Sequence, residues 1–239
     1  MTERLLSTVS FIQKGTGKDL LFLHGYLSSK EAFSAQIAYF SRFYRVTAID
    51  FLGFGKSRPL TTPFSVGDYS RWLEDVLLAL HVKKPHVIAH SFGCRVAVVT
   101  AARNAKAFDK IVLTGPAGII LKRGFAYRVK VGAYRLVKKI APRFAEKKFG
   151  SKEYRSLSPI MKESYKKIVN EDLRVYAKQV KNEVLILQGE KDKTVTDKEA
   201  EIYLRSFPLA TKKTLDGGHF SFVEFPVAFN LMVEDFLYG

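Results

Sequence analysis

The run from Val87 to Cys94 constrains the fold of this 239-residue chain more than any other stretch. It reads Val-Ile-Ala-His-Ser-Phe-Gly-Cys, an apolar strand that ends in a serine and continues as a helix. A serine hydroxyl is a poor nucleophile unless the backbone exposes it and a base lies beside it. A sharp strand–serine–helix turn exposes the hydroxyl and requires small residues two positions before and after the serine, which Ala89 and Gly93 supply. We therefore interpret Ser91 as a candidate nucleophile, the alternative being an ordinary serine N-cap of the helix.

Apolar strand patterns alternate with helical patterns along most of the chain. Strands are expected at residues 6–13, 19–24, 44–50, 87–90, 111–114, 184–188 and 212–215, and helices at 32–40, 66–80, 92–103, 196–206 and 222–237. This alternation predicts an α/β fold, a mostly parallel central sheet with helices on both faces. The link between the first two strands is too short for a crossover, so we expect them to pair antiparallel at one edge.

The alternation is interrupted at Gly115-Pro116, and about seventy residues of basic amphipathic character follow. Apolar residues recur there at helical spacing, at Phe125, Val129, Ala133, Leu136, Val137 and Ile140. Ser158 followed by Pro159 predicts the start of a further helix. We predict that residues 116–182 form an α-helical cap inserted into a core made of residues 1–115 and 183–239.

The positive charge of the chain is concentrated in that inserted segment. The formal net charge is +16, and residues 121–182 hold 18 Lys and Arg against 5 Asp and Glu, which is +13 of it. Such a charge raises the question of nucleic acid or anionic membranes as partners. No nucleic-acid-binding pattern accompanies the charge, so we expect no nucleic acid partner, and peripheral contact with anionic membranes remains a minor alternative.

Polar residues follow several strands at the point where each strand ends. In an open parallel sheet these ends meet at one edge, where ligands bind. His219 follows the last short strand, within Leu-Asp-Gly-Gly-His, and is the natural base near neutral pH. Asp192 follows the strand before it, and a buried carboxylate there would orient the imidazole. The rival acids are Glu190, Asp197 and Asp216, whereas the loop after Thr114 carries no acid.

An oxyanion needs two preorganised N–H donors near the nucleophile. We assign these to the backbone N–H groups of Tyr26, in the loop that starts at His24-Gly25, and of Phe92, at the start of a helix.

The glycine-containing loop 50–57 matches neither the phosphate-binding nor the dinucleotide-binding pattern, so we interpret it as structural and expect no cofactor. No Cys and His cluster has metal-ligand spacing, and we expect no metal.

These residues, in this order, resemble the α/β-hydrolase superfamily. The resemblance rests on His24-Gly25, Asp50-x-x-Gly53-x-Gly55-x-Ser57, the turn at Ser91, Gly189-x-x-Asp192 and Gly218-His219-Phe220, and it spans nearly the whole chain. The order nucleophile, acid, base is the one that this family uses. The resemblance implies a Ser91–His219–Asp192 catalytic triad, and it implies that residues 116–182 cover the active site. Ala89 and Cys94 depart from the usual glycines of the turn, which implies only slight local repacking.

We expect a serine esterase of the carboxylesterase type, which cleaves carboxylic esters through an acyl-enzyme. Phe33, Phe125 and Phe220 are candidate pocket residues, with Phe92 beside them. The alternatives are a hydrolase or lyase of C–C bonds, lactones or thioesters that uses the same triad on an anionic substrate, and a non-catalytic ligand- or membrane-binding protein. The single cysteine and the absence of a signal-peptide pattern predict a cytoplasmic location, and the oligomeric state is not indicated.

Overall fold

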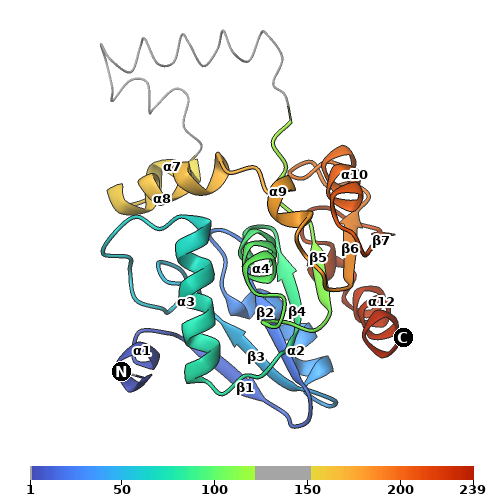
Figure 1. The fold of residues 1–239 in the computed structure, drawn as a ribbon, viewed down its shortest axis with the longest axis horizontal. Helices are drawn as coiled ribbons and strands as arrows, with labels where there is room; N and C mark the ends of the chain where they lie inside the picture. The colour runs from blue at the N-terminus through green and yellow to red at the C-terminus, as the bar shows by residue number, and fades with distance from the viewer. Residues whose placement is uncertain (1, 122–151) are drawn as a thin grey trace, which may run out of the picture.

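A seven-stranded sheet forms the centre of the computed structural model, which describes residues 2–121 and 152–239 (Figure 1). The strands are β1 (Phe11–Lys14), β2 (Asp19–Leu23), β3 (Arg45–Ile49), β4 (His86–His90), β5 (Ile111–Thr114), β6 (Val184–Gly189) and β7 (Ala210–Leu215). Their order across the sheet is β1-β3-β2-β4-β5-β6-β7. All neighbours are parallel except β1 and β3, so the carboxyl ends of six strands meet at one edge.

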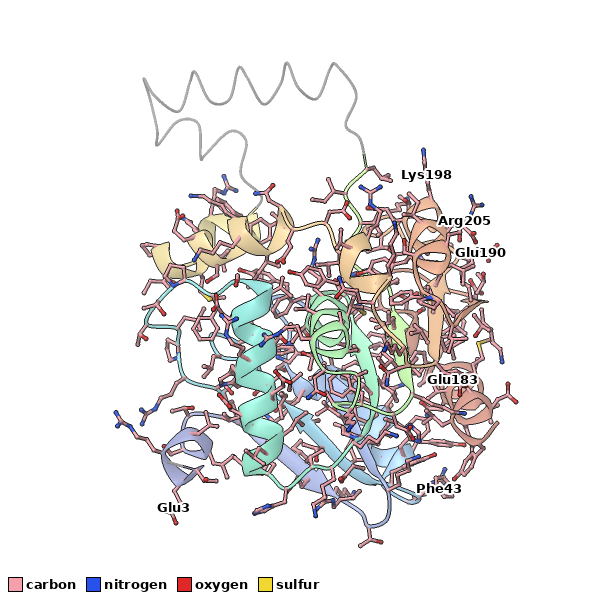
Figure 2. All side chains as sticks on the ribbon, in the orientation of Figure 1. Glu3, Phe43, Glu183, Glu190, Lys198 and Arg205 are labelled. Atoms are coloured by element: carbon pink, nitrogen blue, oxygen red, sulfur yellow. The ribbon has the colours of Figure 1, made fainter. Side chains whose placement is uncertain are left out.

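Helices cover both faces of this sheet, as the sequence predicts. They are α1 (Thr2–Leu6), the 3-10 helix η1 (Lys30–Phe33), α2 (Ser34–Phe40), α3 (Val66–Ala79), α4 (Phe92–Arg103), α7 (Lys152–Ser156), α8 (Pro159–Val169), α9 (Arg174–Ala177), α10 (Asp197–Ser206), α11 (Ser221–Glu224) and α12 (Pro226–Tyr238). In Figure 1, α3 and α4 lie in front of the sheet, and α7 and α8 lie beyond the upper end of α3. Figure 2 shows side chains filling the space between the layers, with Lys198 and Arg205 of α10 projecting from the surface.

Alternate residues of the strands enter different cores. In β2, Leu21 and Leu23 pack with α3 and α4, whereas Leu20 and Phe22 pack with α2 and α12. This period of two is the geometry of a pleated strand, and burial on both faces explains why β2 reads as a continuous apolar run. The mostly parallel α/β architecture is thus confirmed.

The pairing of the first strand differs from the expectation. Residues 6–13 do not form one strand, because α1 ends at Leu6 and β1 begins at Phe11. β1 is antiparallel and at an edge, but it pairs with β3 and not with β2. The chain turns at Gly15 (φ +83°), directly against the residues that precede β3. A Cβ on Gly15 would lie 2.3 Å from the Ser41 and Tyr44 carbonyl oxygens, so only glycine allows the chain to cross the end of β3 here. The buried β2 then takes an interior position.

The final helix is also divided. A continuous helix was expected over residues 222–237, but α11 ends at Glu224 and α12 begins at Pro226. Proline cannot donate a backbone hydrogen bond and disfavours helical geometry in the residue before it, so Phe225 (φ −129°, ψ 61°) leaves the helical region. The expected start of α8 is confirmed, because the Ser158 side chain accepts from the Met161 N–H and Pro159 is the first helical residue.

The loop that follows β3 is structural, as interpreted from its sequence. The buried Asp50 carboxylate accepts hydrogen bonds from the Lys30 N–H and from Lys30 Nζ, both at 2.8 Å, and from the Lys56 N–H at 2.9 Å. A Cβ on Gly55 (φ +53°) would lie 2.3 Å from the Asp50 carboxyl carbon. The loop therefore wraps tightly around one carboxylate. No helix within residues 2–121 and 152–239 has the length and apolar character needed to cross a membrane.

Three buried histidines accompany the sheet: His24, His86 and His90. Burial lowers the pKa of His24 and of His86 to about 4, and that of His90 to about 3, from an ordinary value of 6.5. These imidazoles are therefore neutral in the folded protein at pH 5, whereas they bind protons in the unfolded chain.

We predict that the protein loses stability as the pH falls from 7 to 5. The unfolded chain binds more protons than the folded one in this range, so each buried histidine lowers the free energy of unfolding by roughly 2 kcal/mol. Urea unfolding at the two pH values measures the change, and His86→Asn should remove about one third of it. An unfolding free energy that is equal at pH 5 and pH 7 would contradict the assignment.

Candidate active site

The turn between β4 and α4 holds Ser91 in a conformation that few non-glycine residues adopt. Its φ is 50° and its ψ is −104°, and its N–H donates to the Thr114 carbonyl at 3.1 Å. A Cβ on Gly93 would lie 2.2 Å from the Leu23 carbonyl oxygen, so α4 begins in close contact with β2. Only glycine fits there, in agreement with the small residue that the sequence analysis requires. The turn leaves the Ser91 side chain half-buried at the carboxyl edge of the sheet.

His219 and Asp192 meet at the same edge. The imidazole Nδ1–H donates to Asp192 Oδ2 at 2.8 Å, and the Asp192 side chain is fully buried. The other carboxylate oxygen, Oδ1, accepts from the Thr194 and Val195 N–H groups at 2.7 and 3.0 Å. A carboxylate can only accept, so Nδ1 carries the proton and Nε2 is the basic nitrogen of the neutral ring.

Electrostatics keep Asp192 ionised. Burial by itself would raise the pKa of Asp192, but the hydrogen bonds from His219 and from the two backbone N–H groups hold it below its ordinary range. The carboxylate is therefore charged at neutral pH and stabilises a positive charge on the adjacent imidazole.

Two glycines make room for this pair. Gly115 (φ +51°) lies where a Cβ would be 3.0 Å from His219 Nδ1 and 3.4 Å from Asp192 Oδ2. A Cβ on Gly189 would lie 2.2 Å from the Gly218 carbonyl oxygen, which brings the loops after β6 and β7 into contact.

The structure separates Asp192 from the rival acids. Asp216 is exposed and pairs with Lys191 at 2.8 Å, and Asp197 is exposed and pairs with Lys212 at 2.7 Å. Glu190 points outward from the surface (Figure 2). Among the candidate acids, Asp192 is the one that contacts His219.

Ser91 and His219 line one cavity of about 620 Å³. Its walls come from the loops after β2, β4, β6 and β7, from α4 and α10, and from the segment between β5 and β6. They include Gly25, Tyr26, His90, Ser91, Phe92, Arg95, Thr194, Val195, Glu199, His219, Phe220, residues 117–121, Tyr154, Leu157, Tyr165, Ile168 and Val169. Within the described part of the chain the Ser91 hydroxyl makes no hydrogen bond. In enzymes without substrate, the contact between nucleophile and base is often long and tightens on binding.

Tyr26 and Phe92, whose backbone N–H groups are the expected oxyanion donors, line the cavity together with Ser91. Neither N–H has a hydrogen-bond acceptor among the described residues, and that of Phe92 lies at the N-terminus of α4. The Tyr26 side chain donates to the Met161 carbonyl at 3.3 Å, and burial raises its pKa, so its hydroxyl remains neutral.

The expected pocket phenylalanines have three different outcomes. Phe220 lines the cavity and is 43% exposed, and Phe92 lines it as well. The placement of Phe33 in the pocket was wrong. Its ring is fully buried on the opposite face of the sheet, stacked on Phe222 at 4.7 Å, because η1 precedes α2 in the other core. Phe125 lies outside the described residues.

His90 is a site residue that the sequence analysis does not single out. It lines the cavity, and its ring centroid lies 4.7 Å from that of His219. Its Nε2–H donates to the His219 carbonyl at 2.9 Å, which fixes the backbone of the base. Its Nδ1 is buried and has no partner among the described residues. A polar residue at the end of a fully buried strand was the available signal.

His24 and Cys94 have structural positions. The His24 Nδ1–H donates to the Gly25 carbonyl at 2.7 Å, and its Nε2 accepts from the Phe51 N–H at 3.1 Å. The Cys94 thiol is buried and donates to the Ala89 carbonyl at 3.1 Å, and burial raises its pKa. No group of three or more His, Cys, Asp or Glu residues within 2–121 and 152–239 is placed to hold a metal ion.

Comparisons with known proteins agree with this fold. Residues 19–136 match the family model described as the alpha/beta hydrolase fold. The probable lysophospholipase BODYGUARD 3 of Arabidopsis thaliana is 33% identical over 132 residues, which are 53% of this chain and 26% of that protein. The (E)-2-((N-methylformamido)methylene)succinate hydrolase of Acinetobacter baylyi is 30% identical over 86 residues, 36% of this chain and 33% of that one. These alignments thus span about a quarter to a third of the relatives' own lengths.

Similarity to solved structures extends over the whole chain. A hydrolase from Oleispira antarctica superposes with a TM-score of 0.81 at 15% identity and covers 100% of this chain and 97% of its own. The sheet order, the turn at Ser91 and the family match together establish that the chain belongs to the α/β-hydrolase superfamily.

We predict that Gly93→Ala destabilises the protein by about 3 kcal/mol or more, because its Cβ would overlap the Leu23 carbonyl. Gly67→Ala is the matched control, since Gly67 also lies in the first turn of a helix but its Cβ would have no atom closer than 3.7 Å. The control should be neutral or stabilising by about 0.5–1 kcal/mol. Thermal unfolding measures both variants, and equal stabilities would contradict the close approach of α4 to β2.

Proposed function

We propose that this protein is a serine hydrolase that cleaves carboxylic esters through an acyl-enzyme intermediate. The observation that carries the proposal is the 2.8 Å hydrogen bond from His219 Nδ1–H to the buried Asp192 carboxylate, formed at the cavity that Ser91 also lines. That bond leaves Nε2 available as a base, which is the arrangement that activates a serine.

In the proposed mechanism, Ser91 Oγ attacks the ester carbonyl while His219 Nε2 takes its proton. The tetrahedral intermediate collapses, the proton passes from Nε2 to the departing alkoxide, and the acyl group remains on Ser91. Water then attacks the acyl-enzyme with His219 again as the base, and the proton passes from Nε2 to Ser91 Oγ as the ester bond to the enzyme breaks and the acid product leaves. Asp192 keeps the ring in the productive tautomer and stabilises the imidazolium in both halves.

The Tyr26 and Phe92 N–H groups would stabilise the developing oxyanion. Both groups lack an acceptor among the described residues, and the start of α4 adds the positive end of a helix dipole. Donors held by the fold need no reorganisation as the negative charge forms.

Residues 116–182 would act as a cap on a core of residues 1–115 and 183–239. The described part of this segment supports the idea, because Leu157, Tyr165 and Ile168 line the cavity that holds Ser91. An apolar wall over the site limits the access of water and provides a surface for the substrate. The same groups would open lactones or thioesters, so these belong in any substrate survey.

We predict that a fluorophosphonate probe labels the wild-type protein and fails to label Ser91→Ala. In a panel of p-nitrophenyl esters of graded acyl length, kcat of Ser91→Ala should fall by at least about 10³-fold, because the covalent intermediate cannot form. The chain-length profile separates a short-chain esterase from a lipase-like enzyme. A wild-type protein that remains unlabelled under conditions that label a control esterase would refute the nucleophile.

We predict that Asp192→Asn lowers kcat by about 10³–10⁴-fold, because an amide in place of the carboxylate disfavours the productive tautomer and the imidazolium. Asp216→Asn removes the same charge from the adjacent loop and should leave kcat within about twofold, since Asp216 pairs with Lys191 at the surface. Circular dichroism verifies folding. Equal losses in the two variants would exclude a specific role for Asp192.

A further inference from the structure

Arg95 is a buried cation in the wall of the active-site cavity. Arg95 lies in the first turn of α4, four residues after Ser91, and only 7% of its surface is exposed. An α-helix rises 1.5 Å per residue, so its Cα lies about 6 Å along the axis from that of Ser91. A buried arginine at this distance from a nucleophile requires an electrostatic partner.

The described residues accept hydrogen bonds from only one of the three guanidinium nitrogens of Arg95. Nη1 donates to the Ile168 and Glu171 carbonyls, both at 2.9 Å, at the C-terminal end of α8. Within residues 2–121 and 152–239, Nε and Nη2 make no hydrogen bond, and no carboxylate lies within 4.0 Å of Arg95. Among the described residues, the guanidinium is therefore hydrogen-bonded only to two carbonyl groups, and the Glu171 and Asp172 carboxylates act on its charge from beyond 4.0 Å.

Glu171 and Asp172 are the carboxylates whose charges act on Arg95, and neither lies within 4.0 Å of its guanidinium. Asp172 accepts two hydrogen bonds from the Arg174 guanidinium, at 2.9 and 2.7 Å, and one each from the Arg174 and Ile120 N–H groups, both at 3.0 Å. Glu199, which lines the cavity, accepts from the Thr196 N–H and hydroxyl at the start of α10. Neither Asp172 nor Glu199 is free to neutralise the guanidinium.

Burial without an ion pair is costly for a guanidinium. Desolvation is the largest influence on the pKa of Arg95 and lowers it, and the nearby Glu171 and Asp172 carboxylates offset only part of that effect. A guanidinium presents its donors in a planar fork that matches a carboxylate in bidentate geometry, and such charge-assisted bonds are strong in a desolvated site.

We propose that Arg95 binds the carboxylate of an anionic substrate and so selects small esters that carry a carboxylate a few bonds from the scissile carbonyl. This inference rests on the proposed function, since it identifies the class of ester that the same cavity accepts. Arg95 is a specificity-determining residue that contacts the distal end of the substrate. The competing explanation is purely structural: Arg95 joins α4 to the end of α8 through the two carbonyls.

Paired substrates distinguish these two roles. Monomethyl glutarate and methyl 5-oxohexanoate have the same length and differ in that a methyl group replaces one carboxylate oxygen. The wild type should hydrolyse the anionic ester with the higher kcat/KM, and Arg95→Gln should lose about 10–100-fold on that ester alone, the worth of a charged hydrogen bond. Arg103→Gln, which removes an exposed arginine at the other end of α4, should retain the wild-type preference.

Equal losses on both esters, or a wild type that does not prefer the anionic ester, would overturn the proposal. Arg95→Lys keeps a cation at the position without the planar fork and should retain an intermediate preference. It also provides the test if Arg95→Gln fails to fold, as judged by thermal unfolding.

A binding measurement separates this inference from the proposed function. Calorimetric titration of Ser91→Ala with glutarate requires no turnover, and binding should weaken at least about tenfold when Arg95→Gln is added. Binding that depends on Arg95, without hydrolysis of any ester, would refute the proposed function and preserve the anion site. Ester hydrolysis with no dependence on Arg95 would refute the anion site alone, and the absence of both would refute both.

Discussion

The contact between the start of α4 and the end of β2 determines the geometry of the entire candidate site. Gly93 lies so close to the Leu23 carbonyl that the helix axis is fixed against the sheet. That proximity forces the chain to reverse at Ser91, whose φ of 50° is unfavourable for a residue with a side chain. The same reversal starts α4 at Phe92, whose N–H has no acceptor among the described residues, and places Arg95 in the cavity wall. One close backbone contact therefore positions a hydroxyl, a hydrogen-bond donor and a buried cation together.

The two oxygens of Asp192 have separate structural effects. Oδ1 binds the N–H groups of Thr194 and Val195 and fixes the local loop, whereas Oδ2 binds the imidazole of His219. His219 is held from a second direction, because its carbonyl accepts from the buried His90. Side chain and backbone of the candidate base are thus anchored by different strands, and the ring has little freedom to leave the cavity.

Local patterns were sufficient to predict much of this architecture. Parallel strands must end at a common edge, so the positions of Ser91, Asp192 and His219 after three strands predicted that they share it. Contacts between side chains from segments far apart in the sequence leave no comparable pattern in the sequence. His90 and His219 are 129 positions apart, and nothing in either segment indicates that a ring nitrogen of one meets the carbonyl of the other. Phe33 and Phe220 are equally apolar, so composition could not show which of them lies in the opposite core. The pairing of β1 with β3 depended on how a glycine turn crosses a neighbouring strand.

The position of Cys94 gives the molecule an internal reporter. It is the chain's single cysteine. Its thiol is buried in the first turn of α4, three residues after Ser91, and donates a hydrogen bond to the Ala89 carbonyl. A thiol reagent can reach it only when the first turn of α4 separates from the sheet, because a buried, protonated thiol is unreactive. The rate of its alkylation under native conditions therefore measures how often the turn at Ser91 opens, with no label added to the protein.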